Sequence, residues 1–292
     1  MRYIELSAPS SFPGSDAVLA LWYLETPRSH PFERVLPLPS TELIVNLSDP
    51  YEVIAPESPP APTPQVFLTG VRDRIIGFRN PRRLRHFGMR FSLEGVSRIG
   101  VVPGDGVSAV PDGLAQRLLA EIPRSMRRGP LQSGSPDDDA VRQCLEALAR
   151  VLAAALEPES EAHRTVRAAL GILTQDPTTG LGGIADGLGI SHKTLISRFR
   201  STTGSTPSRI ARLLMVHRLL GGLPARSEPW TWTEVVAESP FADQSHFIRA
   251  FRRATGLSPR EYLAALSESS YDTPYFIGSS AEEAEPEGAA PR

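Results

Sequence analysis

The sequence predicts an α+β fold in which a β-rich, barrel-like N-terminal part precedes an all-α part. Between Met1 and about Val110, short apolar runs are separated by turns rich in proline and glycine, a pattern typical of strands. From about residue 160 the apolar residues recur instead at helical spacing. In this second region, residues 191–210 return as residues 243–262 at a constant offset of 52 positions. The α part is therefore expected to hold two copies of one helical unit.

The apolar runs of the N-terminal part cover residues 43–47, 66–69, 74–78 and 87–91. Several short strands at hairpin spacing predict a small barrel or sandwich with its own core. The two histidines of this part, His30 and His86, form no His-x-His pair and have no carboxylate at ligand spacing. Structural roles are expected for both, and neither a metal nor another cofactor is predicted.

The region between the two parts combines helical patterns with a linker. Residues 112–122 form a short amphipathic pattern, residues 123–138 are rich in Pro, Gly and Ser, and residues 139–156 carry an apolar stripe at helical spacing. This stripe is expected to pack on the barrel or on the α part. A dimer seam is the alternative, although two heptads are few for a coiled coil. Cys144, the only cysteine, lies in this segment and is expected to be buried.

The sequence accordingly predicts four segments. These are a β-rich sensor or regulatory domain over residues 1–115, a linker with amphipathic helices over 116–158, an all-α domain over 159–267 and an acidic tail over 268–292. The tail is rich in Ser, Ala and Pro, so disorder is expected there. No apolar run is long enough to cross a membrane, and the N-terminus lacks a basic-then-apolar signal. A cytoplasmic protein with no membrane partner is therefore expected.

Each copy of the repeat begins and ends with residues that favour helix ends. Ser191 and Asp243 can accept hydrogen bonds from the free amides at a helix N-terminus, and Gly204 and Gly256 suit a C-terminal stop. The apolar residues that lie four apart and are expected to face inward are Leu195 and Phe199 in the first copy, and Phe247 and Phe251 in the second. The other positions are mostly polar or basic and are expected to face outward.

A shorter helical pattern and a tight turn precede each copy. In the first copy, residues 181–188 lead to Gly189, which suits a sharp bend between two helices that cross at a large angle. In the second copy, residues 232–237 lead to Pro240 and Phe241, so the turn is one residue longer and begins with proline. Both patterns predict a helix-turn-helix.

These motifs resemble the C-terminal signature of the AraC/XylS class of bacterial transcription regulators. The second copy matches through residues 241–247, 251–253 and 256–262, and the first through residues 189–195, 199–200 and 204. Two positions depart from the family pattern: Pro240, where glycine is usual, and Ser197, where arginine is frequent. The resemblance covers roughly residues 160–266, and it implies a sequence-specific DNA-binding regulator without enzymatic activity.

The same resemblance implies two recognition helices, held about 34 Å apart by a connecting helix, that read successive faces of the major groove. Residues 206–220 fit the connector, and Arg209, Arg212 and Arg218 lie within reach of phosphates. The N-terminal part is similar to the cupin-like domains that are often coupled to such readers, through residues 35–47 and 88–91. A domain of this kind implies an effector site or a role in assembly.

Positions in the motif divide the outward residues into two sets. Contacts to base edges are expected from Lys193, Ile196 and Ser197 in the first copy, and from Gln244, Ser245, Ile248 and Arg249 in the second. Glutamine suits adenine, while lysine and arginine suit guanine. Phosphate or scaffold roles are expected from Arg200, Thr203, His246, Arg252 and Arg253. For each single residue, a solvated side chain on a helix surface is the alternative.

The distribution of charge agrees with DNA binding, although the total does not indicate it. The chain has 31 Lys and Arg against 33 Asp and Glu, a net charge of −2. Residues 161–266, however, hold 13 basic and 8 acidic residues, whereas residues 267–292 hold 1 and 6. The only lysine, Lys193, lies in the first repeat helix. The basic excess is therefore concentrated in the repeat region.

A second group of basic residues lies in the N-terminal part. An anionic effector, DNA phosphate and an acidic partner are its candidate ligands, but a solvated loop with local salt bridges is the favoured interpretation. The group consists of Arg72, Arg74, Arg79, Arg82, Arg83 and Arg85.

Three classes of function remain. The favoured one is a transcription regulator whose partners are double-stranded DNA and RNA polymerase, with a small-molecule effector and a homodimer as further candidates. The second is a DNA-associated enzyme such as a repair protein, which needs a reactive cysteine in a basic, exposed setting. The third is a protein-interaction module with reduced DNA contact, which the departures at Pro240 and Ser197 would favour.

Overall fold

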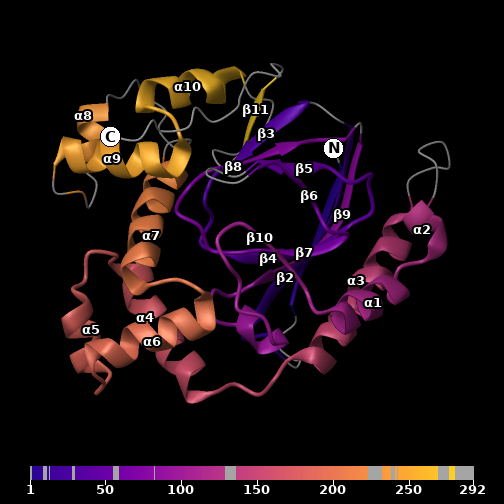
Figure 1. Cartoon of the computed structure of the whole chain (residues 1–292), viewed down its shortest axis with the longest axis horizontal. Coiled ribbons are helices and arrows are strands. Elements are labelled where there is room, and N and C mark those ends of the chain that lie inside the picture. Colours follow the sequence, from indigo (N-terminus) through magenta and orange to yellow (C-terminus); the bar gives the residue numbers. More distant parts are fainter. Residues whose placement is uncertain are drawn as a thin grey trace.

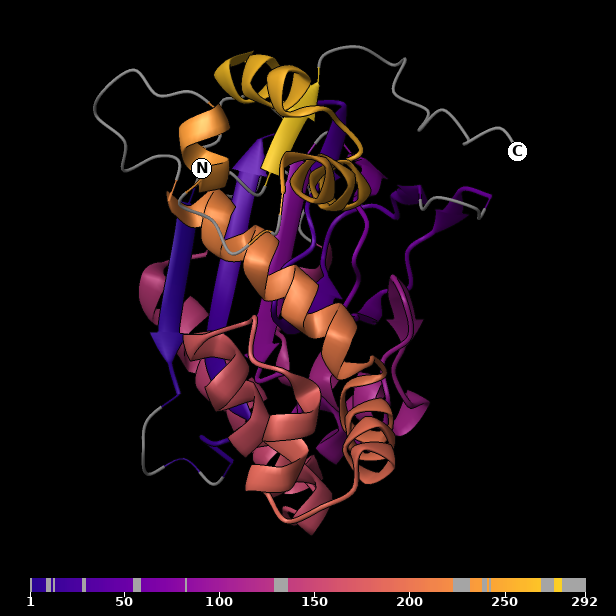
Figure 2. The ribbon, with the colours of Figure 1, turned by 90° about the vertical axis from the view of Figure 1, so that its left-hand side faces the viewer.

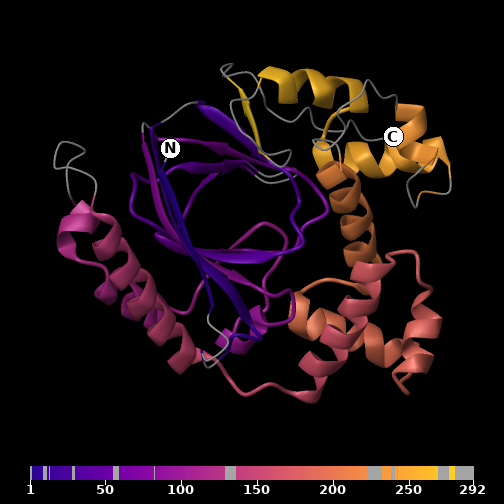
Figure 3. The ribbon, with the colours of Figure 1, turned by 180° about the vertical axis from the view of Figure 1, so that it is seen from behind.

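A computed structural model of the chain confirms the α+β class, with two antiparallel sheets in the N-terminal part and a helical C-terminal part (Figure 1). The structure describes residues 2–8, 12, 14–27, 30–54, 59–81, 83–128, 136–222, 232–237, 241, 243–268 and 276–279. Figures 1 and 3 show the sheets curving around a common axis between two sets of helices. One set is α1 to α3, and the other is the helical part, residues 161–268.

The first sheet has six strands in the order β1-β2-β9-β4-β7-β10. Their bounds are β1 Arg2–Ser7, β2 Val18–Pro27, β4 Thr41–Asn46, β7 Val66–Thr69, β9 Arg83–Phe91 and β10 Val107–Ala109. Strand β9 lies at the centre and is buried along most of its length, because helices cover one side of the sheet and the barrel interior covers the other. Gly88 of this strand pairs with Trp22, and a Cβ atom at this glycine would lie 2.0 Å from the indole. A side chain there would displace Trp22.

The second sheet has five strands in the order β11-β3-β8-β5-β6. Their bounds are β3 Phe32–Val35, β5 Glu52–Ile54, β6 Ala61–Pro62, β8 Ile76–Arg79 and β11 Phe276–Ser279. An apolar cluster that includes Val35, Phe67, Ile76 and Phe78 fills the space between the two sheets. The predicted strand-rich part with its own core is thus confirmed.

Strand β11 corrects the expectation of a disordered tail. Of residues 268–292, Phe276–Ser279 form this strand, which pairs antiparallel with β3 from Phe276 opposite Val35 to Ser279 opposite Phe32. Ile277 is 2% exposed and joins the apolar core of the second repeat unit. Composition suggested disorder because the acidic residues around this short apolar stretch dominate the average. Residues 269–275 and 280–292 lie outside the described part of the chain.

Three helices join the two parts: α1 Asp112–Glu121, α2 Arg124–Arg128 and α3 Asp138–Ala155. The apolar stripe of α3 includes Val141, Leu145 and Leu148, and it packs on the first sheet in one core with Tyr23 and Phe87. Packing on the barrel, one of the two expected structural interpretations, is therefore confirmed for this helix. The interpretation of residues 123–138 as linker was wrong in part, because α2 lies within that segment.

Cys144 of α3 is buried, as the sequence predicted. Its Sγ lies 3.7 Å from the Sδ of Met126, and burial raises the pKa of the thiol. A thiol in this setting is protonated and inert at neutral pH.

Three arginines of the basic group of the N-terminal part make local ion pairs. Arg79 binds Glu52 at 2.8 Å on the surface, while Arg83 and Arg85 both bind the buried Glu25, at 2.8 and 2.7 Å. The predicted local salt bridges are confirmed for these three arginines. The predicted solvated loop is wrong for them, because Arg79 ends β8, Arg83 and Arg85 lie in β9, and Arg85 is buried. Arg82 lies outside the described residues.

The helical part contains α4 Glu161–Gln175, α5 Leu181–Gly187, α6 His192–Thr203, α7 Pro207–Gly222, α8 Trp232–Ala237, α9 Gln244–Thr255 and α10 Pro259–Glu268. We call α5 with α6 the first unit, α8 with α9 the second unit, and α6 and α9 the repeat helices. Figure 2 shows α7 running between the two units. Ile210 and Leu213 of α7 pack in the core of the first unit, and Val216 and Leu220 pack in that of the second. The predicted connector is confirmed.

Candidate nucleic-acid interface

The two repeat helices have the same length and the same ends. Helix α6 follows Ser191, whose Oγ accepts the Thr194 amide at 3.0 Å, and α9 follows Asp243, whose Oδ1 accepts the His246 amide at 2.7 Å. These bonds satisfy amides that an α-helix leaves free at its N-terminus. Both helices have 12 residues, and both end at a left-handed glycine. The caps and the offset of 52 positions predicted from the repeat are therefore confirmed.

The inward faces of the repeat helices hold aromatic residues, as predicted. Phe199 in α6 is fully buried, and so are Phe247 and Phe251 in α9, at 1% exposure or less. In the second unit Phe247 and Phe251 lie 5.4 Å apart between ring centroids and contact Trp232 of α8. These contacts fix the rotation of α9 about its axis. They thereby determine which residues of α9 face outward.

A threonine ends each repeat helix in the same way. Thr203 donates a hydrogen bond to the Phe199 carbonyl at 2.8 Å and accepts the Ser205 amide at 3.1 Å. Thr255 makes the equivalent bonds at 2.9 and 3.1 Å. Because Thr203 is fully buried, its side chain shapes the helix exit and lies away from the outward face. Of the phosphate and scaffold roles that the sequence left open for Thr203, only the scaffold role fits.

The turn of the first unit has the predicted glycine. Gly189 has φ +66°, a conformation that glycine adopts without strain, and it lies between α5 and α6. In the second unit, residues 238–240 and 242 lie outside the described part of the chain. The prediction that Pro240 alters the second turn concerns one of those residues.

The predicted base-contacting residues lie on outward faces in both units. Two of them, Ile196 and Ile248, are half-buried. The exposed ones are Lys193, Ser197, Gln244, Ser245 and Arg249. Neither repeat helix contains an Asp or Glu, whereas α6 carries three cations and α9 carries three arginines. Each helix therefore presents a polar, positively charged face without a carboxylate that would repel phosphate.

The two faces are separated by α7. In Figures 1 and 2 the repeat helices lie at opposite ends of α7, with their axes running in roughly the same direction. The first unit is further braced by Arg198, whose Nη2 lies 2.6 Å from Glu161 of α4 and whose Nη1 donates to Thr165. Arg198 thus joins α6 to α4 and stabilises the first unit.

The residues predicted to contact phosphate fall into three groups. Arg200 and Arg252 are exposed in the last turns of the repeat helices, where a cation also favours the helix dipole. His246 is half-buried and packs edge-on against Phe241 at 5.4 Å. Arg253 is 47% exposed and binds Asp73 of the N-terminal part at 2.7 Å. This last contact was not predicted.

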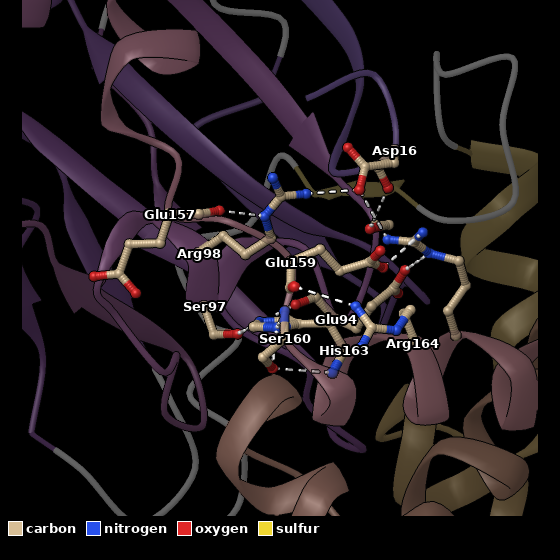
Figure 4. Close-up of polar contacts among 11 residues, drawn as sticks. Asp16, Glu94, Ser97, Arg98, Glu157, Glu159, Ser160, His163 and Arg164 are labelled. Atoms are coloured by element: carbon tan, nitrogen blue, oxygen red, sulfur yellow. Dashed lines mark hydrogen bonds and ion pairs between the residues drawn. The ribbon is translucent and has the colours of Figure 1, made fainter. Parts of the chain in front are cut away.

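Two ionic clusters between the N-terminal and helical parts were missed by the sequence reasoning. The first joins Asp73 to Arg209 and Arg253, which are 136 and 180 residues away in the chain. The second lies near the start of α4, where Asp16 binds Arg98 at 2.7 Å (Figure 4). Asp16 also binds Arg167 of α4 at 3.1 Å. No periodicity or spacing in the sequence links residues so far apart.

A histidine connects the second cluster to the N-terminus of α4. The Nδ1 of His163 accepts the Ser160 amide at 3.1 Å, so the proton is on Nε2, which donates to Ser97 at 3.0 Å. Ser160 in turn caps α4, and Arg98 donates to the Glu157 carbonyl at 2.7 Å (Figure 4). Burial lowers the pKa of His163, and the nearby Arg98 lowers it further. The chain segment that enters the helical part is thus bound firmly to the barrel.

Two capped helices with basic outward faces, each preceded by a shorter helix and joined by a common connector, define a DNA-binding transcription regulator of the helix-turn-helix class. Residues 184–265 match the family model described as "Helix-turn-helix domain". This match, over 82 of the 292 residues, confirms a helix-turn-helix domain in the helical part and agrees with its resemblance to the AraC type.

Solved structures with a similar chain course include ToxT from Vibrio cholerae, at 9% identity and a TM-score of 0.46 over 84% of this chain and 98% of that one. ToxT with a bound unsaturated fatty acid, from the same organism, aligns at 10% identity and a TM-score of 0.45 over 85% and 95% of the two chains. The AraC-like transcriptional activator CuxR aligns at 16% identity and a TM-score of 0.28 over 77% and 87%. Similarities this low carry no functional inference. A comparison with curated proteins gave no match.

Among the helices in the described residues, none is both long and apolar enough to cross a bilayer.

Proposed function

We propose that this protein is a sequence-specific transcription regulator that reads two adjacent major-groove segments of one DNA duplex, with α6 in one segment and α9 in the next. The observation that carries the proposal is the pair of equally capped, carboxylate-free helices at the two ends of one connector. A helix of this diameter fits the major groove, and a rigid connector fixes the spacing of the two groove segments.

The two faces differ in the bases that they suit. In α6, Lys193 suits guanine while Ile196 and Ser197 offer an apolar contact and a hydroxyl. In α9, Gln244 suits adenine and Arg249 suits guanine. The two halves of the operator should therefore differ in sequence, and a single chain would bind an asymmetric site.

Backbone contacts are assigned to Arg200 and Arg252, with His246 and Arg253 beside them. Such contacts hold the protein in register without specifying a base. The N-terminal part would act as the regulatory domain, responding to a small-molecule effector or a second copy of the chain, and the bound regulator would act on RNA polymerase. The ion pairs and shared cores that join the two parts support such control, because they couple the barrel mechanically to both units.

The test is a selection of binding sequences from random duplexes, followed by affinity measurements on the selected duplex. R249A should weaken binding by about 1–3 kcal/mol and relax the preference at one position of one half-site. K193A should do the same in the other half-site. R200A and R252A should weaken binding to all sequences alike and lower the slope of log K against log salt by about 1 each.

R117A is the matched control, because Arg117 is an exposed arginine on α1, away from the repeat helices. It should leave the affinity unchanged. A selection that enriches no motif would refute the proposal. Unchanged affinity in both R249A and Q244A would instead favour a protein-interaction module.

A further inference from the structure

Asp73 of the N-terminal part binds one arginine from the connector α7 and one from the repeat helix α9. It lies between β7 and β8, is 9% exposed, and its Oδ1 accepts a hydrogen bond from Arg209 Nη2 at 3.0 Å. Its Oδ2 accepts from Arg253 Nε at 2.7 Å. Arg209 also binds Asp105, at 2.8 Å. A single carboxylate therefore bridges the first turn of α7 and the last turn of α9.

Arg253 belongs to the outward face of α9. It follows Arg249 by four positions and Ser245 by eight, so the three side chains lie along one stripe of the helix. Two of these residues are proposed to contact bases, and the third is bound to Asp73. The equivalent position in α6, 52 residues earlier, is Ser201, which cannot make this ion pair. The contact is thus specific to the second unit.

Arg209 lies at the first turn of α7, where the helix dipole disfavours a cation. An anion beside Arg209 is therefore favourable, and in this structure the anions are Asp73 and Asp105. Both Arg209 and Arg253 direct N–H groups at the same carboxylate, within 3.0 Å. Guanidinium groups that converge in this way suit a phosphate as well as a carboxylate.

We propose that Arg209 and Arg253 together form a phosphate site for DNA, built from the first turn of α7 and the last turn of α9, and that Asp73 occupies this site when the N-terminal part is docked. Asp73 then acts as an internal competitor of DNA. This inference rests on the proposed function, because it takes α9 to lie in a DNA groove.

The competitor is charged under ordinary conditions. Burial by itself would raise the pKa of Asp73, but the hydrogen bonds from Arg253 and Arg209 outweigh burial and hold the pKa below its usual value. Asp73 is therefore ionised at neutral pH, and DNA has to displace a carboxylate that is already formed. The binding free energy that a DNA phosphate gains from Arg209 and Arg253 is accordingly smaller than it would be if both arginines were free.

The covalent link between the two parts is held by other contacts than those of Asp73. The link, residues 156–160, is anchored by Arg98, which donates to the Glu157 carbonyl and binds Asp16 (Figure 4). Arg167 binds Glu159 of the link and Asp16 as well. Near Asp73, the exits of both repeat helices touch barrel loops, Gly204 at Pro103 and Gly256 at Ile75. Separation at Asp73 with the Arg98 anchor intact would free the phosphate site without detaching the helical part.

The experiment compares the full-length protein with D73N on the selected duplex. D73N removes two ion pairs between a buried carboxylate and partly exposed arginines, so it should bind DNA roughly three- to tenfold more tightly. E52Q is the matched control, because it removes another carboxylate and its ion pair with Arg79 from the same part of the chain. The affinity of E52Q should equal that of the wild type. Equal gains in D73N and E52Q would mean a general effect of charge and would overturn the proposal.

A double-mutant cycle identifies the site. In an R209A/R253A background, D73N should bring no gain in affinity, because its two partners are gone. R253A introduced into D73N should also lower the slope of log K against log salt by about 1. A gain that persists without the two arginines would contradict the assignment. D105N, which removes one partner of Arg209 only, should give a smaller gain than D73N, and an equal one would also contradict it.

Failure of this inference is distinguishable from failure of the proposed function. Wild-type protein that binds the selected duplex, with D73N of equal or lower affinity, would overturn the role of Asp73 alone. D73N is nearly isosteric with the wild type, and thermal unfolding checks that its fold is intact. If D73N does not fold, D105N and R253A on the selected duplex carry the same test.

Discussion

Gly204 and Gly256 end the two repeat helices in the same left-handed conformation, at φ +68° and +69°. Each glycine ends its helix, and its amide donates a hydrogen bond to the carbonyl four residues earlier. The acceptor is Arg200 for Gly204 and Arg252 for Gly256. Their surroundings differ, however. A Cβ atom on Gly204 would lie 1.9 Å from the Pro103 carbonyl oxygen, whereas one on Gly256 would lie 3.3 Å from a methyl group of Ile75. The same stop is thus packed tightly in one unit and loosely in the other.

This difference predicts unequal costs for the two alanine substitutions. G256A should destabilise the fold by about 1–2 kcal/mol, because the left-handed conformation disfavours any Cβ atom. G204A should cost more, because the barrel backbone at Pro103 would also have to move. Chemical denaturation of the two variants measures the difference. A larger cost for G256A than for G204A would contradict the observed packing.

The matched control is G183A. Gly183 lies inside α5, is exposed, and has open space where its Cβ atom would be. Alanine favours a helix interior over glycine by roughly 0.5–1 kcal/mol, so this variant should be slightly more stable than the wild type. A destabilised G183A would show that backbone conformation is not what distinguishes these three glycines.

The repeat explains why the helical part could be predicted in detail. Ser191, Asp243, Gly204 and Gly256 act on amides and carbonyls within four residues of themselves, so their roles follow from local sequence. The outward position of Lys193 and Arg249 follows from helical periodicity in the same way. In the N-terminal part, the strands were expected from their apolar runs. Their order in two sheets was not, because pairing depends on contacts between distant segments.

What the sequence did not predict are the contacts between the two parts. Asp73 meets Arg253 across 180 residues, and neither has an unusual neighbourhood in the sequence. The strand β11 is four residues long and lies within an acidic segment, so its pairing with β3 leaves no periodic pattern. Docking of this kind is decided by the shape of folded surfaces. The interface between the two parts therefore could not be predicted from composition, motifs and spacing.

Cys144 provides a test of the enzymatic alternative. The side chain is 4% exposed and lies against Met126, and burial raises the pKa of its thiol. Native protein should therefore resist an alkylating reagent at neutral pH, whereas denatured protein should take up one equivalent. Mass spectrometry after timed alkylation gives both values. Rapid labelling of the native protein would instead support the alternative of a DNA-repair enzyme with a reactive cysteine.

Buried histidines predict a loss of stability in mild acid. Burial lowers the pKa of His86 to about 4, and it also lowers the pKa of His217 and His163. The unfolded chain, with histidine pKa values near 6.5, binds more protons than the folded protein below that pH. The stabilisation that comes from keeping these histidines neutral is therefore complete above about pH 6.5. The free energy of unfolding should decrease as the pH falls from 6.5 toward 4. For His86 alone the decrease should reach up to about 3 kcal/mol.

H86F removes the most strongly shifted of these groups. His86 lies beside Tyr51, with 5.7 Å between ring centroids, so an aromatic replacement preserves part of the packing. Urea unfolding at a series of pH values should show a shallower decline for H86F than for the wild type, with a remainder due to His163 and His217. Parallel curves for the two proteins would show that His86 is not buried in the neutral form.

The strand β11 ties the end of the chain to the barrel, and two truncations isolate its contribution. A chain that ends at Ser279 retains the strand, whereas one that ends at Glu268 loses it and leaves β3 as an exposed edge of the second sheet. The shorter chain also loses Ile277, whose burial contributes about 1.5–3 kcal/mol. Its free energy of unfolding should be lower by that amount, and amide exchange should rise in β3. The chain that ends at Ser279 should match the full-length protein in both measurements. If the two truncations behave alike, then β11 does not hold the second unit on the barrel, and the apolar cluster around Leu36 and Phe241 must do so alone.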